Sequence, residues 1–252
     1  MSSVDFHIII PARYQSSRFP GKLLQMLGDK TVLESVYQQA LKANPKSIMI
    51  ATDNEQIYAH ANAIGAPVMM TSIMHETGTD RLSEVVTKGQ YQSSDIIVNV
   101  QGDEPFIKPE LITQVAENLE VSHCPVATLS WPLQEASQLA NPNVVKVVCD
   151  AKQKALYFSR APIPYHRDNP NAIEGVYKHI GLYAYRASFL AEWPRLSPSP
   201  LEQYECLEQL RVLAAGLAIH VGIAPCEPLQ DINTPEDLAR ASKQQSHDCQ
   251  GV

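Results

Sequence analysis

Residues 8–22 read Ile-Ile-Ile-Pro-Ala-Arg-Tyr-Gln-Ser-Ser-Arg-Phe-Pro-Gly-Lys, an apolar strand that runs directly into a cationic loop. Arg13, Arg18 and Lys22 lie within ten positions that contain no acidic residue. A buried strand followed by three cations, two serines and a Pro-Gly turn predicts an anion site at the carboxyl edge of a sheet. A polyphosphate is therefore the first ligand to consider.

The loop stands out because the chain as a whole is acidic, with 20 Lys and Arg against 27 Asp and Glu. This balance argues against nonspecific nucleic-acid binding, which requires a basic face, so we expect no nucleic-acid partner. A positive loop on a negative protein favours a small anion instead.

Length and composition describe a globular protein. The 252 residues, 44% of them hydrophobic, suffice for one large core, or for one core plus a subdomain. No apolar stretch approaches the about 18 residues of a membrane helix, and the N-terminus lacks the pattern of an export signal. We therefore expect a cytoplasmic protein without membrane insertion. The five scattered cysteines form no Cys-x-x-Cys pair, which argues against disulfides and a thiolate zinc site.

The first half of the chain alternates apolar, β-branched runs with amphipathic stretches, which predicts a parallel sheet covered on both faces. The strands are expected at 6–10, 47–51, 67–70 and 96–100, and the helices at 31–43, 55–64, 80–88 and 109–119. After about Ala127 the pattern changes to strands at 144–148, 155–159, 180–185 and 219–223, joined by proline-rich loops. This favours antiparallel additions to the sheet, or a subdomain over its edge. Helices are expected at 201–213 and 235–241.

The cationic loop does not match the common phosphate-binding motifs. A Walker A loop would need glycine at position 16 and Ser or Thr after Lys22, but Ser16 and Leu23 stand there. No Gly-x-Gly-x-x-Gly follows the first strand, so a dinucleotide fold loses its main support. The loop is therefore interpreted as one in which side chains supply the charge, with Lys22 as a point charge and the arginines as bidentate donors.

Residues 98–105, Val-Asn-Val-Gln-Gly-Asp-Glu-Pro, form the second candidate, because a buried strand again ends in acids. Asp103 would lie at the same crevice as the cationic loop, where a carboxylate can hold Mg²⁺ together with substrate phosphates. Two weaker candidates lie before helices. Residues 76–81 offer backbone N–H groups to an anion or a base, and residues 230–237 offer a second set of oxygen ligands.

Together these motifs closely resemble the 3-deoxy-D-manno-octulosonate cytidylyltransferases, or CMP-Kdo synthetases, over nearly the whole chain. The matching segments are Ile-Pro-Ala-Arg-Tyr-x-Ser-Ser-Arg-Phe-Pro-Gly-Lys at 10–22, Ala-Thr-Asp at 51–53, Gly-Thr-Asp-Arg-Leu at 78–82, and the motif at 98–105. They continue with Ala-Leu-Tyr-Phe-Ser-Arg-Ala-Pro-Ile-Pro at 155–164, Lys-His-Ile-Gly-Leu-Tyr-Ala-Tyr-Arg at 178–186, and Leu-Glu-Gln-Leu-Arg at 207–211. The last three segments favour Kdo as the acceptor.

The resemblance implies an α/β fold: a three-layer, mostly parallel, Rossmann-like nucleotidyltransferase (GT-A-like) sheet with an antiparallel extension. It implies one domain, 1–252, with a CTP-binding half at 1–127 and an acceptor-binding and dimerisation subdomain at 128–226. The implied reaction is CTP plus Kdo giving CMP-Kdo and pyrophosphate for lipopolysaccharide synthesis, with Mg²⁺ as cofactor and a homodimer as the assembly.

The resemblance also implies roles for individual residues. The catalytic group would be Arg13, Lys22 and Asp103, and the nucleotide would contact Arg13, Ser16, Ser17, Lys22, Thr79, Asp80, Arg81 and Gln101. The acceptor would contact Arg160, His179, Tyr185, Glu208 and Gln209, with Arg160 facing the sugar carboxylate. Asp103 would hold the metal with Asn233 or Asp231. The family usually has aspartate where this chain has Asn233, so the second ligand is left open between these two.

Three other functions remain to be compared. One is a cytidylyltransferase for another acid sugar, such as 8-amino-Kdo or sialic acid. Another is a sugar transferase that uses a ready-made nucleotide sugar, which would need no cationic grip on a triphosphate. The last is a nucleotide-binding regulator, which would bind CTP without turnover.

Overall fold

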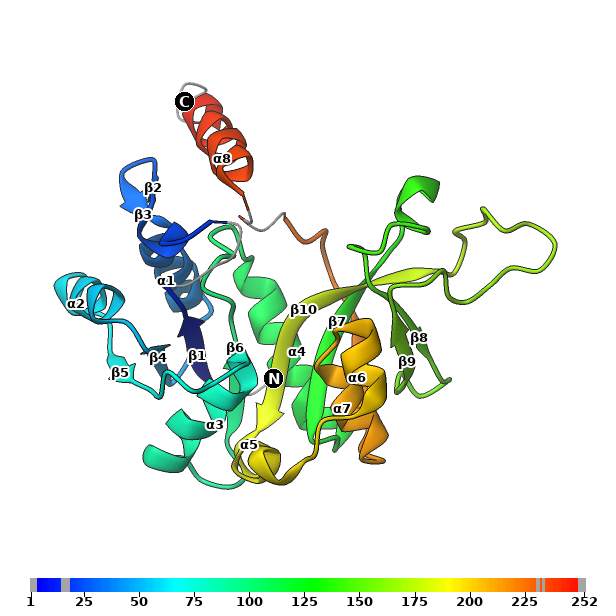
Figure 1. Ribbon diagram of the computed structural model, residues 1–252, viewed down its shortest axis with the longest axis horizontal. Helices are drawn as coiled ribbons and strands as arrows, with labels where there is room; N and C mark the ends of the chain where they lie inside the picture. Colours follow the sequence, from blue (N-terminus) through cyan, green and yellow to red (C-terminus); the bar gives the residue numbers. More distant parts are fainter. Residues whose placement is uncertain (1–3, 15–18, 230–231, 233, 249–252) are drawn as a thin grey trace.

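The computed structural model describes residues 4–14, 19–229, 232 and 234–248. A nine-stranded sheet forms its centre (Figure 1). Its strands are β1 His7–Ala12, β4 Ser47–Thr52, β5 Val68–Met70, β6 Ile96–Asn99, β7 Val126–Pro132, β8 Lys146–Cys149, β9 Ala155–Ser159, β10 Tyr177–Arg186 and β11 Ile219–Ile223. A separate two-stranded ribbon consists of β2 Met26–Leu27 and β3 Lys30–Thr31.

The described helices flank this sheet. The α-helices are α1 Val32–Lys42, α2 Glu55–Ala63, α3 Gly78–Lys88, α4 Pro109–Ser122, α5 Ala187–Glu192, α6 Pro200–Glu205, α7 Gln209–Ala214 and α8 Pro235–Asp248. Three short 3₁₀ turns add η1 Lys22–Leu24, η2 Ala136–Gln138 and η3 Trp193–Arg195. None of the helices in the described ranges is long and apolar enough to cross a membrane.

The strand order is β11-β7-β10-β6-β1-β4-β5, and in this path only β10 runs against its neighbours. The β8–β9 hairpin extends the sheet beyond β10, at the end of the molecule that bears the long loop between β9 and β10 (Figure 1). The predicted mostly parallel sheet with antiparallel additions is therefore confirmed. Residues from both halves of the chain contribute strands to this one sheet.

The alternation of side chains along β1 creates the three layers. Ile8 and Ile10 are fully buried in one core with residues of α1, α2 and α4, whereas Ile9 is fully buried in a second core with α3, α5 and α7. Successive side chains of a strand point to opposite faces, so a strand buried on both faces must be apolar throughout. The predicted α/β three-layer architecture is confirmed.

Local sequence signals explain where the site-forming helices begin. Thr31 caps α1 by accepting the Glu34 N–H at 3.1 Å, and Thr77 forms a capping box with Asp80 at the start of α3. Pro109 occupies the first turn of α4, where its missing N–H has no consequence.

Two expectations for the second half were wrong. The predicted helix at 201–213 is two helices, α6 and α7, because Cys206 adopts a left-handed conformation (φ 50°) that ends the first of them. Strand β7 was not expected, although it lies next to β10 and contributes Leu129 to the core. Its apolar and β-branched sequence, Val-Ala-Thr-Leu-Ser-Trp-Pro, could have indicated a strand.

Candidate active site

The carboxyl ends of three parallel strands bring the first two candidate motifs together. Strand β1 ends opposite the end of β4, with Ala12 paired with Thr52, and β6 ends at Asn99, which pairs with Ile9 of β1. Arg13 and Asp53 therefore follow adjacent strands at one edge, as predicted for this class of sheet. Gln101, half-buried, follows β6 at this edge.

The cationic loop closes on itself before Lys22. Gly21 donates its N–H to the Tyr14 carbonyl at 2.9 Å and adopts φ 67°, a conformation that glycine tolerates. A Cβ at this position would also lie 3.3 Å from the Tyr14 ring. Lys22 thus begins η1 in a fixed position. The predicted nucleotide contacts Ser16 and Ser17 lie outside the described residues.

Lys22 and Asp103 meet at the sheet edge. The Lys22 ammonium contacts the Asp103 carboxylate and donates to the Ile232 carbonyl at 3.2 Å. The Ile232 N–H in turn donates to the Asp103 carbonyl at 3.1 Å, so the segment before α8 is attached to the same point. Gly102 lets the chain before Asp103 pass close to the backbone of β1, because a Cβ there would lie 3.0 Å from the Pro11 carbonyl oxygen. Asp231 and Asn233 lie outside the described residues.

Arg13, which follows β1 at the same edge, is oriented by the loop between β5 and α3. Arg13 donates to the His75 carbonyl at 2.7 Å, and His75 lies in a loop. The His75 ring contacts Glu84 on α3. Burial acts to raise the pKa of Glu84, but hydrogen bonds from Lys88, Ser72 and His75 outweigh it and lower this pKa to about 2. The loop that orients Arg13 is therefore held by a charged carboxylate.

Side chains in the first turn of α3 contact Asp53, which follows β4, and Trp193 in η3. Arg81 is fully buried, donates to Asp53 at 2.7 Å and contacts the Thr71 hydroxyl, while its Nε has no partner among the described residues. Asp80 accepts the Trp193 indole N–H at 2.7 Å. Burial acts to raise the pKa of Asp80, but hydrogen bonds from Trp193 and Thr77 lower it below the ordinary value.

Thr79 connects this turn to the predicted acceptor residues. Its hydroxyl donates to the Glu208 carboxylate, which precedes α7. Burial raises the pKa of Glu208, although hydrogen bonds from Thr79 and Thr77 partly oppose it. The turn predicted to bind the nucleotide and a residue predicted to bind the acceptor are therefore in direct contact.

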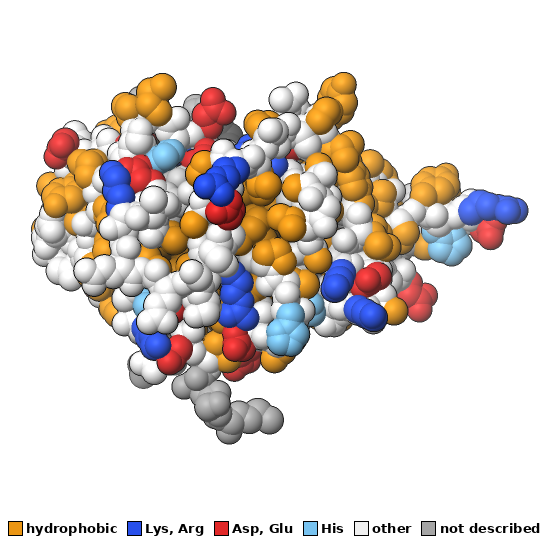
Figure 2. All heavy atoms as spheres, turned by 90° about the horizontal axis from the view of Figure 1, so that it is seen from below, with side chains coloured by type: hydrophobic (Ala, Val, Ile, Leu, Met, Phe, Trp, Pro, Cys, Tyr) orange, Lys and Arg blue, Asp and Glu red, His pale blue; other side chains and the backbone are white. Residues whose placement is uncertain are grey.

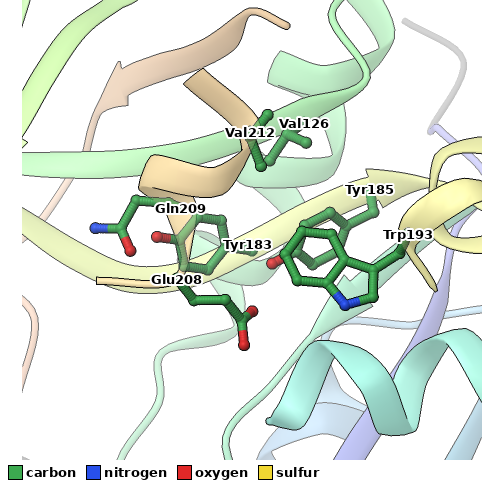
Figure 3. Close-up of a pocket in the computed structure, with 7 residues that line it drawn as sticks. All are labelled: Val126, Tyr183, Tyr185, Trp193, Glu208, Gln209 and Val212. Atoms are coloured by element: carbon green, nitrogen blue, oxygen red, sulfur yellow. The ribbon is translucent and has the colours of Figure 1, made fainter. Parts of the chain in front are cut away.

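Glu208 lines a small cavity with Val126, Tyr183, Tyr185, Trp193, Gln209 and Val212 (Figure 3). Its volume is ≈ 40 Å³, enough for a few water molecules. The buried Gln209 amide nitrogen has no hydrogen-bond partner among the described residues. Three of the five predicted acceptor residues, Tyr185, Glu208 and Gln209, thus line one cavity.

A row of aromatic rings forms the floor beneath this cavity. The ring centroids of His179 and Tyr183 are 5.3 Å apart, those of Tyr183 and Tyr185 5.7 Å, and the row continues through Phe189 to Trp193. Burial lowers the pKa of His179 to about 3, so this side chain is neutral. The row also carries charge at its end, because the Arg211 guanidinium lies 4.5 Å from the Trp193 ring centroid.

Arg160 lies at the junction of β9 and α6 and is already hydrogen-bonded. Its guanidinium donates to the carbonyls of Glu205 at 2.6 Å, Cys206 at 3.2 Å and Pro142 at 2.8 Å. Three of its five N–H donors are used in these bonds, and two remain for a ligand. The predicted acceptor residue Arg160 is thus a neighbour of the α6–α7 turn.

Sequence reasoning missed several residues that organise the site. Asp53 was given little weight, although it follows a buried strand as Arg13 does, and it pairs with Arg81. Trp193 lies in a stretch without a motif, Arg211 belongs to the 207–211 motif but was given no role, and Lys146 appeared to be one residue of an ordinary strand. Only the folded arrangement reveals their contacts.

The chain is similar to proteins of known family. The family profile described as Cytidylyltransferase matches residues 7–219. The chain is 59% identical to the 3-deoxy-manno-octulosonate cytidylyltransferase of Legionella pneumophila (strain Corby), covering 96% of each chain. It is 48% identical to that of Vibrio parahaemolyticus, covering 93% of this chain and 96% of the relative. A solved structure of CMP:2-keto-3-deoxy-manno-octonic acid synthetase complexed with CTP matches with a TM-score of 0.90 and 39% identity, covering 97% of this chain and 99% of that one.

Proposed function

The chain belongs to the cytidylyltransferase family, and from that premise we propose that it transfers CMP from CTP to 3-deoxy-manno-octulosonate (Kdo). The reaction releases pyrophosphate, and the product, CMP-Kdo, supplies lipopolysaccharide synthesis. We assign the reaction to the cytoplasm, where CTP is available.

The hydrogen bond between Thr79 and Glu208 carries this proposal. Direct transfer requires both substrates in contact, because the acceptor oxygen must reach the α-phosphorus. The bond joins the helix turn assigned to the nucleotide with the cavity assigned to the acceptor. A regulator that only binds CTP has no need of such an adjoining cavity. A transferase of ready-made nucleotide sugars has no need of cations such as Arg13 and Lys22 around a triphosphate.

In this proposal the anomeric hydroxyl oxygen of Kdo attacks the α-phosphorus and loses its proton to water. The bond between the α-phosphorus and the oxygen that bridges to the β-phosphate breaks, and pyrophosphate leaves. Arg13 and Lys22 stabilise the charge on the α-phosphate and on the leaving pyrophosphate. We expect the Lys22 ammonium, which contacts Asp103, to turn toward the phosphate oxygens when CTP binds. The remaining nucleotide contacts are assigned to Ser16, Ser17, Thr79, Asp80, Arg81 and Gln101.

Asp103 is the residue to which we assign Mg²⁺. Its side chain is 26% exposed at the sheet edge, and its backbone carbonyl accepts the Ile232 N–H. In the ranges with described placement, no three His, Cys, Asp or Glu side chains form a metal cluster. A single exposed carboxylate such as that of Asp103 fits Mg²⁺, which takes one or two protein carboxylates and completes its shell with phosphates and water. When bound, the ion would act as a Lewis acid at the phosphate oxygens.

The acceptor is assigned to Arg160, His179, Tyr185, Glu208 and Gln209. The cavity of ≈ 40 Å³ is far smaller than an eight-carbon sugar requires, so we expect the side chains around it to move when Kdo binds. The amide of Gln209 supplies a free donor for a sugar hydroxyl or carboxylate oxygen.

We also propose that the chain works as a homodimer through the part after residue 128. Leu156 on β9, Tyr165 in the following loop, and Leu201 and Tyr204 on α6 are exposed apolar side chains of this part. Hydrophobic side chains also gather toward the end of the molecule that bears the projecting loop (Figure 2). These side chains give a second copy an apolar surface to cover.

Pyrophosphate release from CTP with a panel of acceptors tests the proposed function. With Mg²⁺ present, Kdo should release pyrophosphate much faster than sialic acid or no acceptor. Equal release with Kdo and sialic acid would refute the assignment of the acceptor. Binding of CTP without turnover on any acceptor would instead support the regulator.

A further inference from the structure

Lys146 is a lysine buried inside the β8–β9 part of the sheet. Its side chain is 0% exposed, and its ammonium donates to three backbone carbonyls, Val144 at 2.6 Å, Arg160 at 2.7 Å and Asn141 at 3.1 Å. These bonds use all three of its donors. A buried ammonium is costly unless it is fully hydrogen-bonded, so this arrangement fixes the backbone at each of the three carbonyls.

The carbonyl of Arg160 is the functionally important one of the three. Arg160 follows the last residue of β9, and its backbone N–H donates to the Glu205 carboxylate at 2.9 Å. Its side chain donates to the carbonyls of Glu205 and Cys206. The last carbonyls of a helix lack partners within the helix, so Arg160 acts as a cap at the end of α6.

This cap lies where the chain changes direction. Cys206 adopts φ 50°, after which α7 begins at Gln209 with Glu208 before it. Ser159 makes a second connection to the same place, because its hydroxyl donates to the Glu205 carboxylate at 2.6 Å. The β9 end is therefore bonded to the turn that leads to Glu208 and Gln209, the two residues that line the cavity in Figure 3.

We propose that Lys146, which does not line the cavity, is a positioning residue for the acceptor: it fixes Arg160, and through the α6–α7 turn it fixes Glu208 and Gln209. The inference rests on the proposed function, since it concerns the acceptor part of that site. It predicts that loss of the Lys146 ammonium weakens acceptor binding and leaves the nucleotide part of the site intact, because Lys22, Arg13 and Asp103 belong to other elements.

The test compares Lys146→Met with Lys154→Met, which makes the same chemical change at an exposed lysine of the same hairpin. Both are assayed as the full chain below their melting temperatures. We expect Lys146→Met to raise the KM for Kdo roughly tenfold, the effect of losing one hydrogen bond between the displaced Glu208 or Gln209 and the sugar. The KM for CTP should stay within about twofold of wild type. Lys154→Met should change neither constant. The double variant Lys146→Met/Arg160→Ala should raise the KM for Kdo no further than Arg160→Ala alone, because both act through one turn.

A second measurement does not depend on activity. In the protein without substrates, hydrogen exchange of the amides in residues 207–214 should be faster in Lys146→Met than in Lys154→Met. Unchanged exchange, or equal increases in the KM values for Kdo and CTP, would overturn the inference.

If Lys146→Met does not fold, Ser159→Ala, which breaks the second connection to the same turn, must raise the KM for Kdo selectively. An unchanged KM for Kdo would then overturn the inference. The proposed function is judged separately, by whether the wild-type protein releases pyrophosphate with Kdo.

Discussion

The buried Arg81–Asp53 pair joins the first turn of α3 to the end of β4. Removing its carboxylate measures how much the pair stabilises the fold. Arg81 is 0% exposed and Asp53 17% exposed, with Nη2 and Oδ2 2.7 Å apart. Asp53→Asn keeps the size of the side chain but removes the only carboxylate paired with this buried guanidinium among the described residues. Removing one partner of a buried pair costs 3–5 kcal/mol, and because Asp53 is partly exposed we expect the lower end, about 3 kcal/mol.

The assay is urea unfolding followed by circular dichroism. With an m-value of about 3 kcal/mol per molar, a loss of about 3 kcal/mol lowers the midpoint by about 1 M urea. The control is Glu120→Gln, because the Arg186–Glu120 pair has the same 2.7 Å separation with side chains that are 21% and 50% exposed. An exposed pair contributes less than about 1 kcal/mol, so its midpoint should move by less than about 0.3 M. Equal shifts for the two variants would refute the argument that burial determines the contribution of the Arg81–Asp53 pair.

Three further predictions concern catalysis, pH and the aromatic row. Lys22→Met should lower kcat on the order of a hundredfold, as loss of a preorganised charge does, and a loss below tenfold would make Lys22 only a binding residue. Because the pKa of His179 falls from 6.5 to about 3 on folding, the unfolded chain binds an extra proton between these values. Stability should therefore fall as the pH drops from about 6.5 to about 3, and less steeply in His179→Gln in thermal melts at several pH values. Trp193→Phe should destabilise the fold by about 1–2 kcal/mol, since it removes the bond to Asp80, and a neutral result in urea unfolding would contradict that role.

The strands and helices of the first half could be predicted because they bury whole faces. β1, with Ile8, Ile9 and Ile10, is apolar on both sides, which indicates a central parallel strand, and the cationic loop follows it directly. The second half mixes an antiparallel strand with short helices, and its boundaries depend on single conformations such as that of Cys206. A cysteine in the left-handed conformation gives no signal in sequence, because this conformation favours glycine and asparagine.

The same contrast applies to the site. Charged residues that follow strands, such as Lys22 and Asp103, could be located because the sheet brings strand ends together. Trp193 and Lys146 could not, because nothing in the sequence indicates that the Trp193 indole meets Asp80 or that the Lys146 ammonium is buried against backbone carbonyls. Arg160 was assigned to the acceptor by the resemblance to the family, and its contacts with backbone carbonyls add a role that the motif alone does not indicate.

We propose that the α3 turn and the cavity beside Glu208 form one site for direct transfer of CMP to Kdo. This can be tested by ³¹P NMR of the protein with CTP, Mg²⁺ and Kdo. CMP-Kdo and pyrophosphate should appear together in equal amounts, and neither should form when Kdo is omitted. Pyrophosphate without a CMP-sugar, or no turnover with Kdo at all, would contradict it.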